Sequence, residues 1–303
     1  MANKYLVVRP KYGLCNQLYS ISKGIIFGIL SKRDVIFSNF QMDFRYEDNL
    51  CNFEDVIDIV HLQNILNDKY IEIKVFANND IKDIPKINTH GATEKIPYIK
   101  DFIDLLFKED NIKEEYLDID NPISAQIPTI YHELEKHINA HIKFTNKYIQ
   151  LANNVKKCLN LTKYNCIHIR LEDDSINYMK DMSNTVCLDT VNNIYKNKYI
   201  DQLNILSQTN KNIYTCTGLG INNNINNQFY EELKEKYKLL DKNMYIDIQN
   251  NYRELFAIID YIIATDSEEF IGSDWSSFSL YIYNHHILNN KKAYLIDIWK
   301  SVV

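Results

Sequence analysis

The segment Asn165-Cys166-Ile167-His168-Ile169-Arg170-Leu171-Glu172-Asp173-Asp174 joins an apolar run to a row of three acids. Its first half has the composition of a buried β-strand. His168 and Arg170 stand two residues apart, so on an extended strand both side chains leave by the same face. A guanidinium beside an imidazole at the end of a buried strand can bind a phosphate. A strand that simply ends in solvated charges explains the segment equally well.

Strand and helix patterns alternate on both sides of this segment. Residues 5–9 predict a strand, 16–31 a helix and 34–38 a second strand, an order that favours a parallel α/β sheet. In the second half the patterns predict strands at 166–170, 212–216, 269–271 and 293–298, and helices at 186–208, 228–237, 253–264 and 276–286.

The middle of the chain has a looser pattern. Residues 78–121 are irregular apart from one possible helix at 99–107, and residues 127–159 predict one or two long helices. Their apolar stripe is expected to consist of Ile130, Leu134, Ile138 and Ile142. We therefore expect two Rossmann-like domains, 1–150 and 151–303, which face a cleft and bind ligands at the carboxyl ends of their strands.

The composition excludes several classes of protein. Of the 303 residues, 46% are hydrophobic and 24% are charged, as in a globular protein. The formal net charge is −6 without any basic block, which argues against nucleic acid as a partner. No apolar run approaches the ~20 residues of a membrane helix, and residues 1–8 lack the pattern of a signal peptide.

The six cysteines are scattered and contain no C-x-x-C pair. This spacing predicts buried free thiols in a reducing compartment rather than a disulfide framework or a zinc site. We therefore expect a cytoplasmic protein. His137 and His141 have a spacing that can chelate a metal on a helix, but a solvent-facing helix explains them more simply. Gly218-Leu219-Gly220 lacks the third glycine of a dinucleotide fingerprint.

A second polar segment lies near the end of the chain. Residues 266–279 run from a short apolar strand, through a loop of small hydroxyl residues, into a helix. Ser276 or Ser277 can cap that helix. The same geometry presents hydroxyls and backbone N–H groups to a phosphate, with the helix dipole adding ~0.3–1 kcal/mol. Together with Arg170, this loop would form both sides of a diphosphate clamp.

Four segments, in this order, resemble the GDP-fucose O-fucosyltransferase-like family, particularly its plant-type branch. They are Gly13-Leu14-Cys15-Asn16-Gln17, similar to a G-x-x-N-Q loop; residues 37–43 with 53–58; residues 168–174, similar to an H-x-R-x-E-x-D motif; and residues 213–218 with 253–261 and 270–279. The resemblance implies a GT-B fold, a nucleotide held mainly by the second half, and no required metal or other cofactor. Glu268 stands where many relatives have an aspartate two residues before the phenylalanine, a position that contacts the base in some of them.

The resemblance also implies roles for individual residues. Arg170 would neutralise the leaving diphosphate, and His168 would contact the diphosphate or the sugar. Asn16 would position sugar or acceptor from the first half. The donor-binding set would be His168, Arg170, Glu268, Ser276, Ser277 and Phe278, with Gly13 from the first half. The general base of an inverting transfer would be Asp43, Glu172, Asp173 or Asp174.

The expected reaction is the transfer of fucose from GDP-fucose to a hydroxyl of a protein Ser/Thr or a glycan. Two alternatives stay open. One is the same fold with another donor, UDP-rhamnose or GDP-mannose. The other is a catalytically silent member that binds a glycan or a partner protein.

Overall fold

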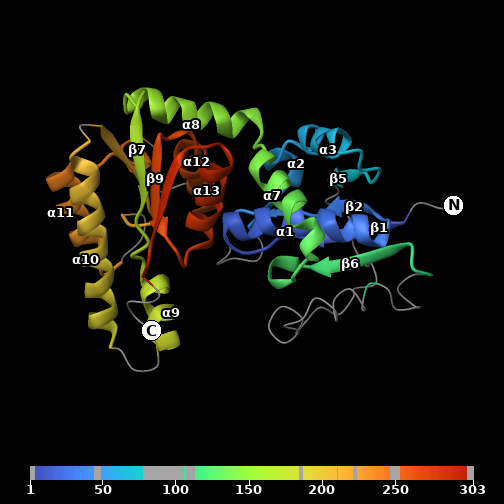
Figure 1. Ribbon diagram of the computed structural model, residues 1–303, viewed down its shortest axis with the longest axis horizontal. Coiled ribbons are helices and arrows are strands. Elements are labelled where there is room, and N and C mark those ends of the chain that lie inside the picture. Colours follow the sequence, from blue (N-terminus) through green and yellow to red (C-terminus); the bar gives the residue numbers. More distant parts are fainter. Residues whose placement is uncertain are drawn as a thin grey trace. The chain divides into compact units, whose positions relative to one another are not determined.

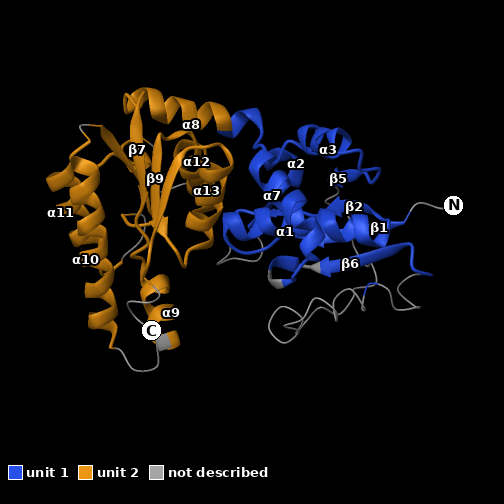
Figure 2. Ribbon diagram, in the orientation of Figure 1, with its two compact units in different colours: residues 1–148 blue, residues 149–303 orange. Residues whose placement is uncertain are grey.

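Two parallel β-sheets carry the helices of this chain, one in each half (Figure 1). The computed structural model describes residues 4–43, 49–77, 106, 113–183, 187–209, 211–220, 224–245 and 253–298. The chain divides into two units, Met1–Tyr148 and Ile149–Val303 (Figure 2). The predicted α/β class is therefore confirmed. The roles assigned to the halves, acceptor side and nucleotide-sugar side, stay predictions.

The first unit contains a sheet in the order β5-β2-β1-β6, with all neighbours parallel. Its strands are β1 (Tyr5–Arg9), β2 (Asp34–Phe37), β5 (Val75–Ala77) and β6 (Tyr116–Asp120), and β3 (Phe40–Gln41) pairs with β4 (Leu50–Cys51). Its helices are α1 (Leu14–Ser31), α2 (Phe53–Val56), α3 (Ile59–Asp68) and α7 (His132–His141). The possible helix at 99–107 lies outside the described residues except for Leu106.

Strand β6 corrects the expectation of an irregular region between residues 78 and 121. It pairs with β1 along its whole length. The buried Asp118 carboxylate accepts from Arg9 Nε at 2.7 Å, and the same oxygen lies 2.7 Å from Arg9 Nη2. The acidic residues of this strand interrupt the apolar pattern that predicts a strand. A strand with buried acids therefore resembles a loop in the sequence until its ion-pair partner is known.

The helical region before the second sheet also differs from the predicted stripe. Ile138 and Ile142 are buried, but Ile130 is 81% exposed. Ile130 lies in a short 3-10 turn (Thr129–Tyr131) that precedes α7, so it does not share the buried face of that helix.

The second unit contains a sheet in the order β10-β9-β7-β8, again with all neighbours parallel. Its strands are β7 (Tyr164–His168), β8 (Asn212–Cys216), β9 (Glu269–Ser273) and β10 (Lys292–Ile296). Its helices are α8 (Asn146–Cys158), which begins at the end of the first unit, α9 (Asp173–Ser183), α10 (Leu188–Ser207), α11 (Asn227–Tyr237), α12 (Arg253–Asp266) and α13 (Ser277–Leu288). Helices cover both faces of this sheet (Figure 1).

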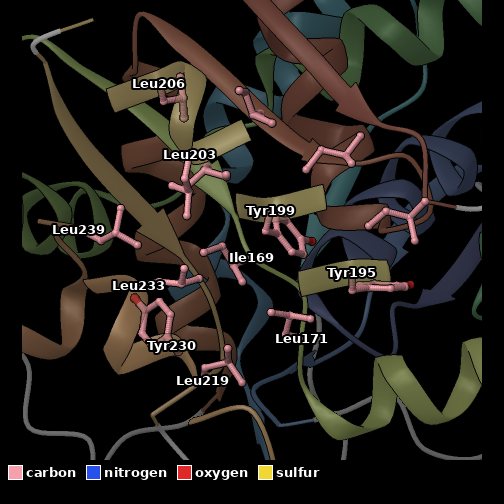
Figure 3. Packing of buried hydrophobic residues seen from close by; sticks show 14 of the residues in the cluster. Ile169, Leu171, Tyr195, Tyr199, Leu203, Leu206, Leu219, Tyr230, Leu233 and Leu239 are labelled. Carbon is pink, nitrogen blue, oxygen red and sulfur yellow. The ribbon is translucent and has the colours of Figure 1, made fainter. Parts of the chain in front are cut away.

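The hydrophobic core of this unit anchors the chain that follows β7. Ile169 and Leu171 are fully buried. Figure 3 shows them among side chains of α10 and α11. The surrounding residues are Tyr195, Tyr199, Leu203, Leu206, Tyr230 and Leu233. Because neighbouring side chains of an extended chain leave by opposite faces, burial of these two residues directs Arg170 away from the core.

The strand order places a topological switch point beside β7, which has β8 on one side and β9 on the other. Chains leaving two such neighbouring strands diverge, and the crevice at their carboxyl ends is where open α/β sheets bind ligands. In the first unit, β1 lies between β2 and β6 in the same way. Among the described residues, no helix has both the length and the apolar character needed to cross a membrane.

Candidate functional site

Arg170 lies just beyond β7, at the carboxyl edge of the second sheet. The sequence predicted a strand that ends at Arg170, but β7 ends at His168. The Ile169 N–H still donates to the Cys216 carbonyl at 3.0 Å, and the Arg170 N–H donates to Tyr199 Oη at 2.9 Å. The backbone on both sides of the guanidinium is therefore held by β8 and α10.

Two carboxylates hold the guanidinium of Arg170. Nη1 lies 3.0 Å from Glu172 Oε2, and Nη2 lies 2.7 Å from Asp174 Oδ2. Burial opposes the charge, but Glu172 and Asp174 raise the pKa of Arg170 above its ordinary value. The side chain is 21% exposed. It is therefore a permanently charged, oriented fork that still reaches the surface, as recognition of an anion requires.

The three acids after Leu171 have different environments. Glu172 is buried, and its Oε1 accepts from the Gly218 N–H at 2.6 Å. A methyl group at Gly218 would lie 2.6 Å from that same oxygen, so this contact requires glycine. Asp173 Oδ1 accepts from the Ile225 N–H at 3.1 Å.

Asp174 is half exposed, unlike Glu172. Burial alone would raise the pKa of Asp174, but Arg170, with a further contribution from Arg253 at 3.9 Å, lowers it. Helix α9, which was not predicted, begins at Asp173. The acids that we interpreted as the end of a strand open this helix, where negative charge interacts favourably with the helix dipole.

His168 is buried and neutral. Burial, then Arg170 and Lys242, lower the pKa of His168 to about 3. Its Nδ1 lies 2.7 Å from Ser279 Oγ, and that hydroxyl accepts from the Ser273 N–H at 3.0 Å. The ring centroid of Phe278 lies 4.8 Å from that of His168. These contacts join the end of β7 to the start of α13.

The start of α13 lies at the carboxyl end of β9, next to β7 in the sheet. Ser276 is the N-cap residue, but its hydroxyl makes no capping bond. Ser277 and Phe278 open the helix, whose first N–H groups lack intrahelical acceptors. The expected capping by a serine side chain at 276 is thus not found. Hydroxyl and backbone donors remain at this edge, which suits an anion.

Close packing of α13 on β9 depends on Gly272. A methyl group at this position would lie 2.6 Å from Ser279 Cβ. Glycine therefore allows Ser279 to reach both Ser273 and His168.

Glu268 is separated from the other predicted donor-binding residues. It precedes β9, and its N–H donates to the carbonyl of Tyr164, the first residue of β7. It thus lies at the amino edge of the sheet, about 15 Å along the strands from the site at the carboxyl edge. Its carboxylate pairs with Lys211, which lowers the pKa of Glu268. The structure does not bring Glu268 to Arg170.

The first unit has a polar loop at the carboxyl end of β1. Gly13 is the N-cap residue of α1, with φ −61°, and Asn16 lies half-buried in the first turn of that helix. A methyl group at Gly13 would meet no atom within 4 Å. Neither backbone conformation nor packing therefore requires glycine at this position.

Gln17 has a structural role in the same loop. Its buried Nε2 donates to the carbonyls of Tyr12 and Gln41, both at 2.8 Å, and its Oε1 accepts from the Gln41 N–H at 2.9 Å. Gln41 Oε1 in turn accepts from the Tyr12 N–H at 2.8 Å. These bonds connect the loop to β3. Asp43, two residues beyond Gln41, is buried.

The carboxyl edge of the second sheet thus brings together His168, Arg170, Glu172 and Asp174 with the start of α13, through the contacts of His168. Gly13, Asn16 and Asp43 belong to the first unit. Thr217, Gly218, Lys242, Arg253 and Ser279 support the second-unit site but were not among the site residues predicted from the sequence. Thr217, Gly218, Arg253 and Ser279 lay within the segments that carry the family resemblance, whereas no signal in the sequence marked Lys242.

Known structures share this architecture along nearly the whole chain. A structure of POFUT1 in complex with GDP-fucose is 13% identical, with a TM-score of 0.62, and the match covers 98% of each chain. A structure of the NodZ alpha-1,6-fucosyltransferase soaked with GDP-fucose is 11% identical, with a TM-score of 0.59, covering 93% of this chain and 92% of that one. A structure of fucosyltransferase NodZ from Bradyrhizobium is 11% identical, with a TM-score of 0.57, and the match covers 93% of each chain. No curated protein sequence matches the chain.

The predicted GT-B fold is therefore confirmed, and the chain belongs to that fold class. The sequence pattern of the GDP-fucose protein O-fucosyltransferase family matches residues 5–289. The chain belongs to this family and is a fucosyltransferase-like glycosyltransferase.

Proposed function

We propose that this protein transfers fucose from GDP-fucose to a hydroxyl acceptor, a protein Ser/Thr or a glycan, with inversion at the anomeric carbon. The observation that carries the proposal is Arg170, a charged fork held by Glu172 and Asp174 at the switch point of the second sheet. The family match and the POFUT1 and NodZ structures, obtained with GDP-fucose, support the choice of donor.

Arg170 and the start of α13 bind the diphosphate in this proposal. Departure of GDP leaves negative charge on the β-phosphate, and a delocalised guanidinium stabilises that charge. Ser276, Ser277 and Phe278 contribute hydroxyl and backbone donors to the phosphates and contact the nucleoside. These groups supply positive charge and hydrogen bonds from the protein itself, so we propose a reaction that requires no metal.

His168 acts as a neutral hydrogen-bonding group. The Ser279 hydroxyl accepts from Ser273 and has one proton of its own. If the Ser279 hydroxyl donates its hydrogen bond to His168 Nδ1, the neutral ring carries its own proton on Nε2. The ring can then donate from Nε2 to the diphosphate or the sugar.

We assign the general base to Asp43. An inverting transfer needs a group that takes the proton of the acceptor hydroxyl. Glu172, Asp173 and Asp174 follow β7 in the second unit, to which we assign the donor, and Glu172 and Asp174 pair there with Arg170, the proposed diphosphate ligand. Asp43 belongs to the first unit, to which we also assign Gly13, Asn16 and the acceptor. Asp43→Asn should lower kcat strongly while the Kd for GDP stays within about twofold. An unchanged kcat would exclude this assignment.

Donor choice is the main point to test. Incubation of the protein with GDP-fucose, GDP-mannose and UDP-rhamnose, with and without EDTA, should give release of GDP only from GDP-fucose and in both conditions. Thermal unfolding with GDP and UDP supplies a second measurement, because a ligand at 100-fold its Kd stabilises by ~2.7 kcal/mol. Stabilisation by UDP alone would overturn the proposed donor. Binding of GDP without any hydrolysis or transfer would identify a catalytically silent member.

We also propose a cytoplasmic location. All six cysteines are free in the structure. Cys158 and Cys187 are exposed rather than buried, contrary to the expectation from the sequence. Exposed free thiols persist in a reducing compartment, which supports this location. Fractionation of the source cells would test it.

A further inference from the structure

Lys242 is a fully buried cation that no step of the proposed transfer uses. Its Nζ lies 2.6 Å from Asp260 Oδ2 and donates to the Thr217 carbonyl at 2.8 Å. Tyr214 Oη donates to the other oxygen of Asp260 at 2.7 Å. A buried ion pair of this kind is commonly no more stabilising than well-packed apolar residues. A contribution to stability therefore gives no sufficient reason for a charge at this position.

The carbonyl that Lys242 binds belongs to the turn after β8, and this turn holds the backbone before Arg170. Thr217 Oγ1 donates to the Ile169 carbonyl at 2.9 Å. The Ile169 N–H donates to the carbonyl of Cys216, the residue before Thr217. A shift of Thr217 therefore also shifts Ile169, which precedes Arg170 in the chain.

The same turn also holds the side-chain partner of Arg170. The Gly218 N–H donates to Glu172 Oε1 at 2.6 Å, and Glu172 Oε2 lies 3.0 Å from Arg170 Nη1. The close approach of Glu172 to Gly218 leaves no room for a Cβ between them. One turn thus fixes both the backbone of Arg170 and the orientation of its guanidinium.

We infer that Lys242, held in place by Asp260, is a positioning residue for Arg170 and acts through the Thr217-Gly218 turn. The inference rests on the proposed function, because it concerns Arg170 as the diphosphate ligand. Lys242 orients the arginine, and the arginine binds the leaving group. The charge of Lys242 also helps to keep His168 neutral, because it is one of the groups that lower the pKa of His168.

The test compares GDP binding by isothermal titration calorimetry in matched variants. Lys242→Met removes the ammonium but leaves Asp260 buried without its ion-pair partner. Lys242→Met/Asp260→Asn removes both charges and keeps an oxygen that accepts from Tyr214. Lys291→Met is the control, because Lys291 Nζ also donates to a backbone carbonyl, that of Thr265, at 2.8 Å.

We expect the neutral double variant to unfold cooperatively and to bind GDP about tenfold more weakly than the wild type, because small displacements of a positioned group are costly. Lys291→Met should bind as the wild type does. In an Arg170→Ala background, the charge-neutral pair of substitutions should cause no additional loss, since Lys242 acts through that arginine. If Lys242 and Asp260 had only a structural role, the double variant would be less stable, but its loss of GDP affinity would not depend on the presence of Arg170.

A double variant that binds GDP as tightly as the wild type would overturn the inference, as would a loss that adds in full to that of Arg170→Ala. If both Lys242 variants fail to fold, Thr217→Val tests the same turn, because it removes the bond to Ile169. Its loss of affinity should likewise vanish without Arg170. A wild type that binds no GDP would contradict the proposed function, and the inference would fall with it.

Discussion

Arg170 and Asp174 form an asymmetric ion pair, in which Nη2 and Oδ2 are 2.7 Å apart but the side chains are 21% and 50% exposed. The arginine is also held from the protein side by the buried Glu172. An anion arriving from solvent can therefore replace Asp174 at the guanidinium while Glu172 keeps the fork oriented. This arrangement provides a pre-oriented cation with one exchangeable partner.

Arg170→Ala should remove most donor turnover. Loss of one preoriented donor at a developing charge costs about 2.7–4 kcal/mol, a factor of roughly 10² to 10³ in kcat. Arg170→Lys should recover little of this, because an ammonium lacks the planar fork. The measurement is the rate of GDP release, with circular dichroism to show that both variants fold. Wild-type turnover in Arg170→Ala would rule out the assignment of this residue.

Glu172 and Asp174 should respond differently to neutralisation. Asp174 is half exposed, and exposed ion pairs contribute only about 0.2–1 kcal/mol, so Asp174→Asn should change the Kd for GDP by less than about fivefold. Glu172→Gln alters a buried contact to both Gly218 and Arg170, so it should weaken GDP binding about tenfold or more. Calorimetric titration compares the two variants. Equal effects would show that burial does not distinguish these carboxylates.

His168 should make the free energy of unfolding decrease as the pH falls. Its pKa is about 3 in the folded chain and about 6.5 when unfolded, so below pH 6.5 the unfolded state binds a proton that the folded state does not. The free energy of unfolding should fall by about 1.4 kcal/mol for each pH unit between roughly 6 and 3. Urea unfolding of wild type and His168→Asn isolates this contribution. Parallel pH profiles for the two proteins would contradict it.

Gly13→Ala should separate binding from folding. The position has an ordinary φ and open space, so the entropic gain from Ala of about 0.4–1 kcal/mol should be opposed by the preference for Gly over Ala at an N-cap, and the free energy of unfolding should change by less than about 1 kcal/mol. If sugar or acceptor approaches α1 here, the methyl group should raise KM. Gly272→Ala is the contrasting variant, because its Cβ would clash with Ser279, at a cost of about 1–3 kcal/mol. Thermal unfolding and steady-state kinetics test both expectations.

Gln17→Met should destabilise the first unit. The substitution keeps the shape of the side chain but leaves the backbone groups of Tyr12 and Gln41 without the partners that Gln17 supplies, at a cost of about 1–3 kcal/mol. Gln63→Met is a matched control, since Gln63 also bonds backbone groups, those of Ile73 and Val75, but at a partly exposed site. Chemical denaturation should show the smaller loss for Gln63→Met.

Periodicity in the sequence was a reliable guide where a segment buries an apolar face. Strands β1 and β8 have the predicted bounds, and helices α10, α11, α12 and α13 begin and end within two residues of theirs. It failed for β6, whose buried Asp118 pairs with Arg9, and for α9, whose first turn is acidic. In both segments a partner distant in sequence, or the helix dipole, compensates charges that local patterns assign to loops.

The sequence by itself determined the alternation of strands and helices and the residue types at the end of β7, because burial and side-chain direction are local properties of the chain. Only the tertiary structure decided that β7 lies between β8 and β9, which brings residues 168–174 beside the start of α13. It also separated Glu268 from that edge and placed Lys242 and Asp260 under the turn that holds Arg170. Such contacts depend on strand order and on pairing between distant segments, which no local pattern encodes.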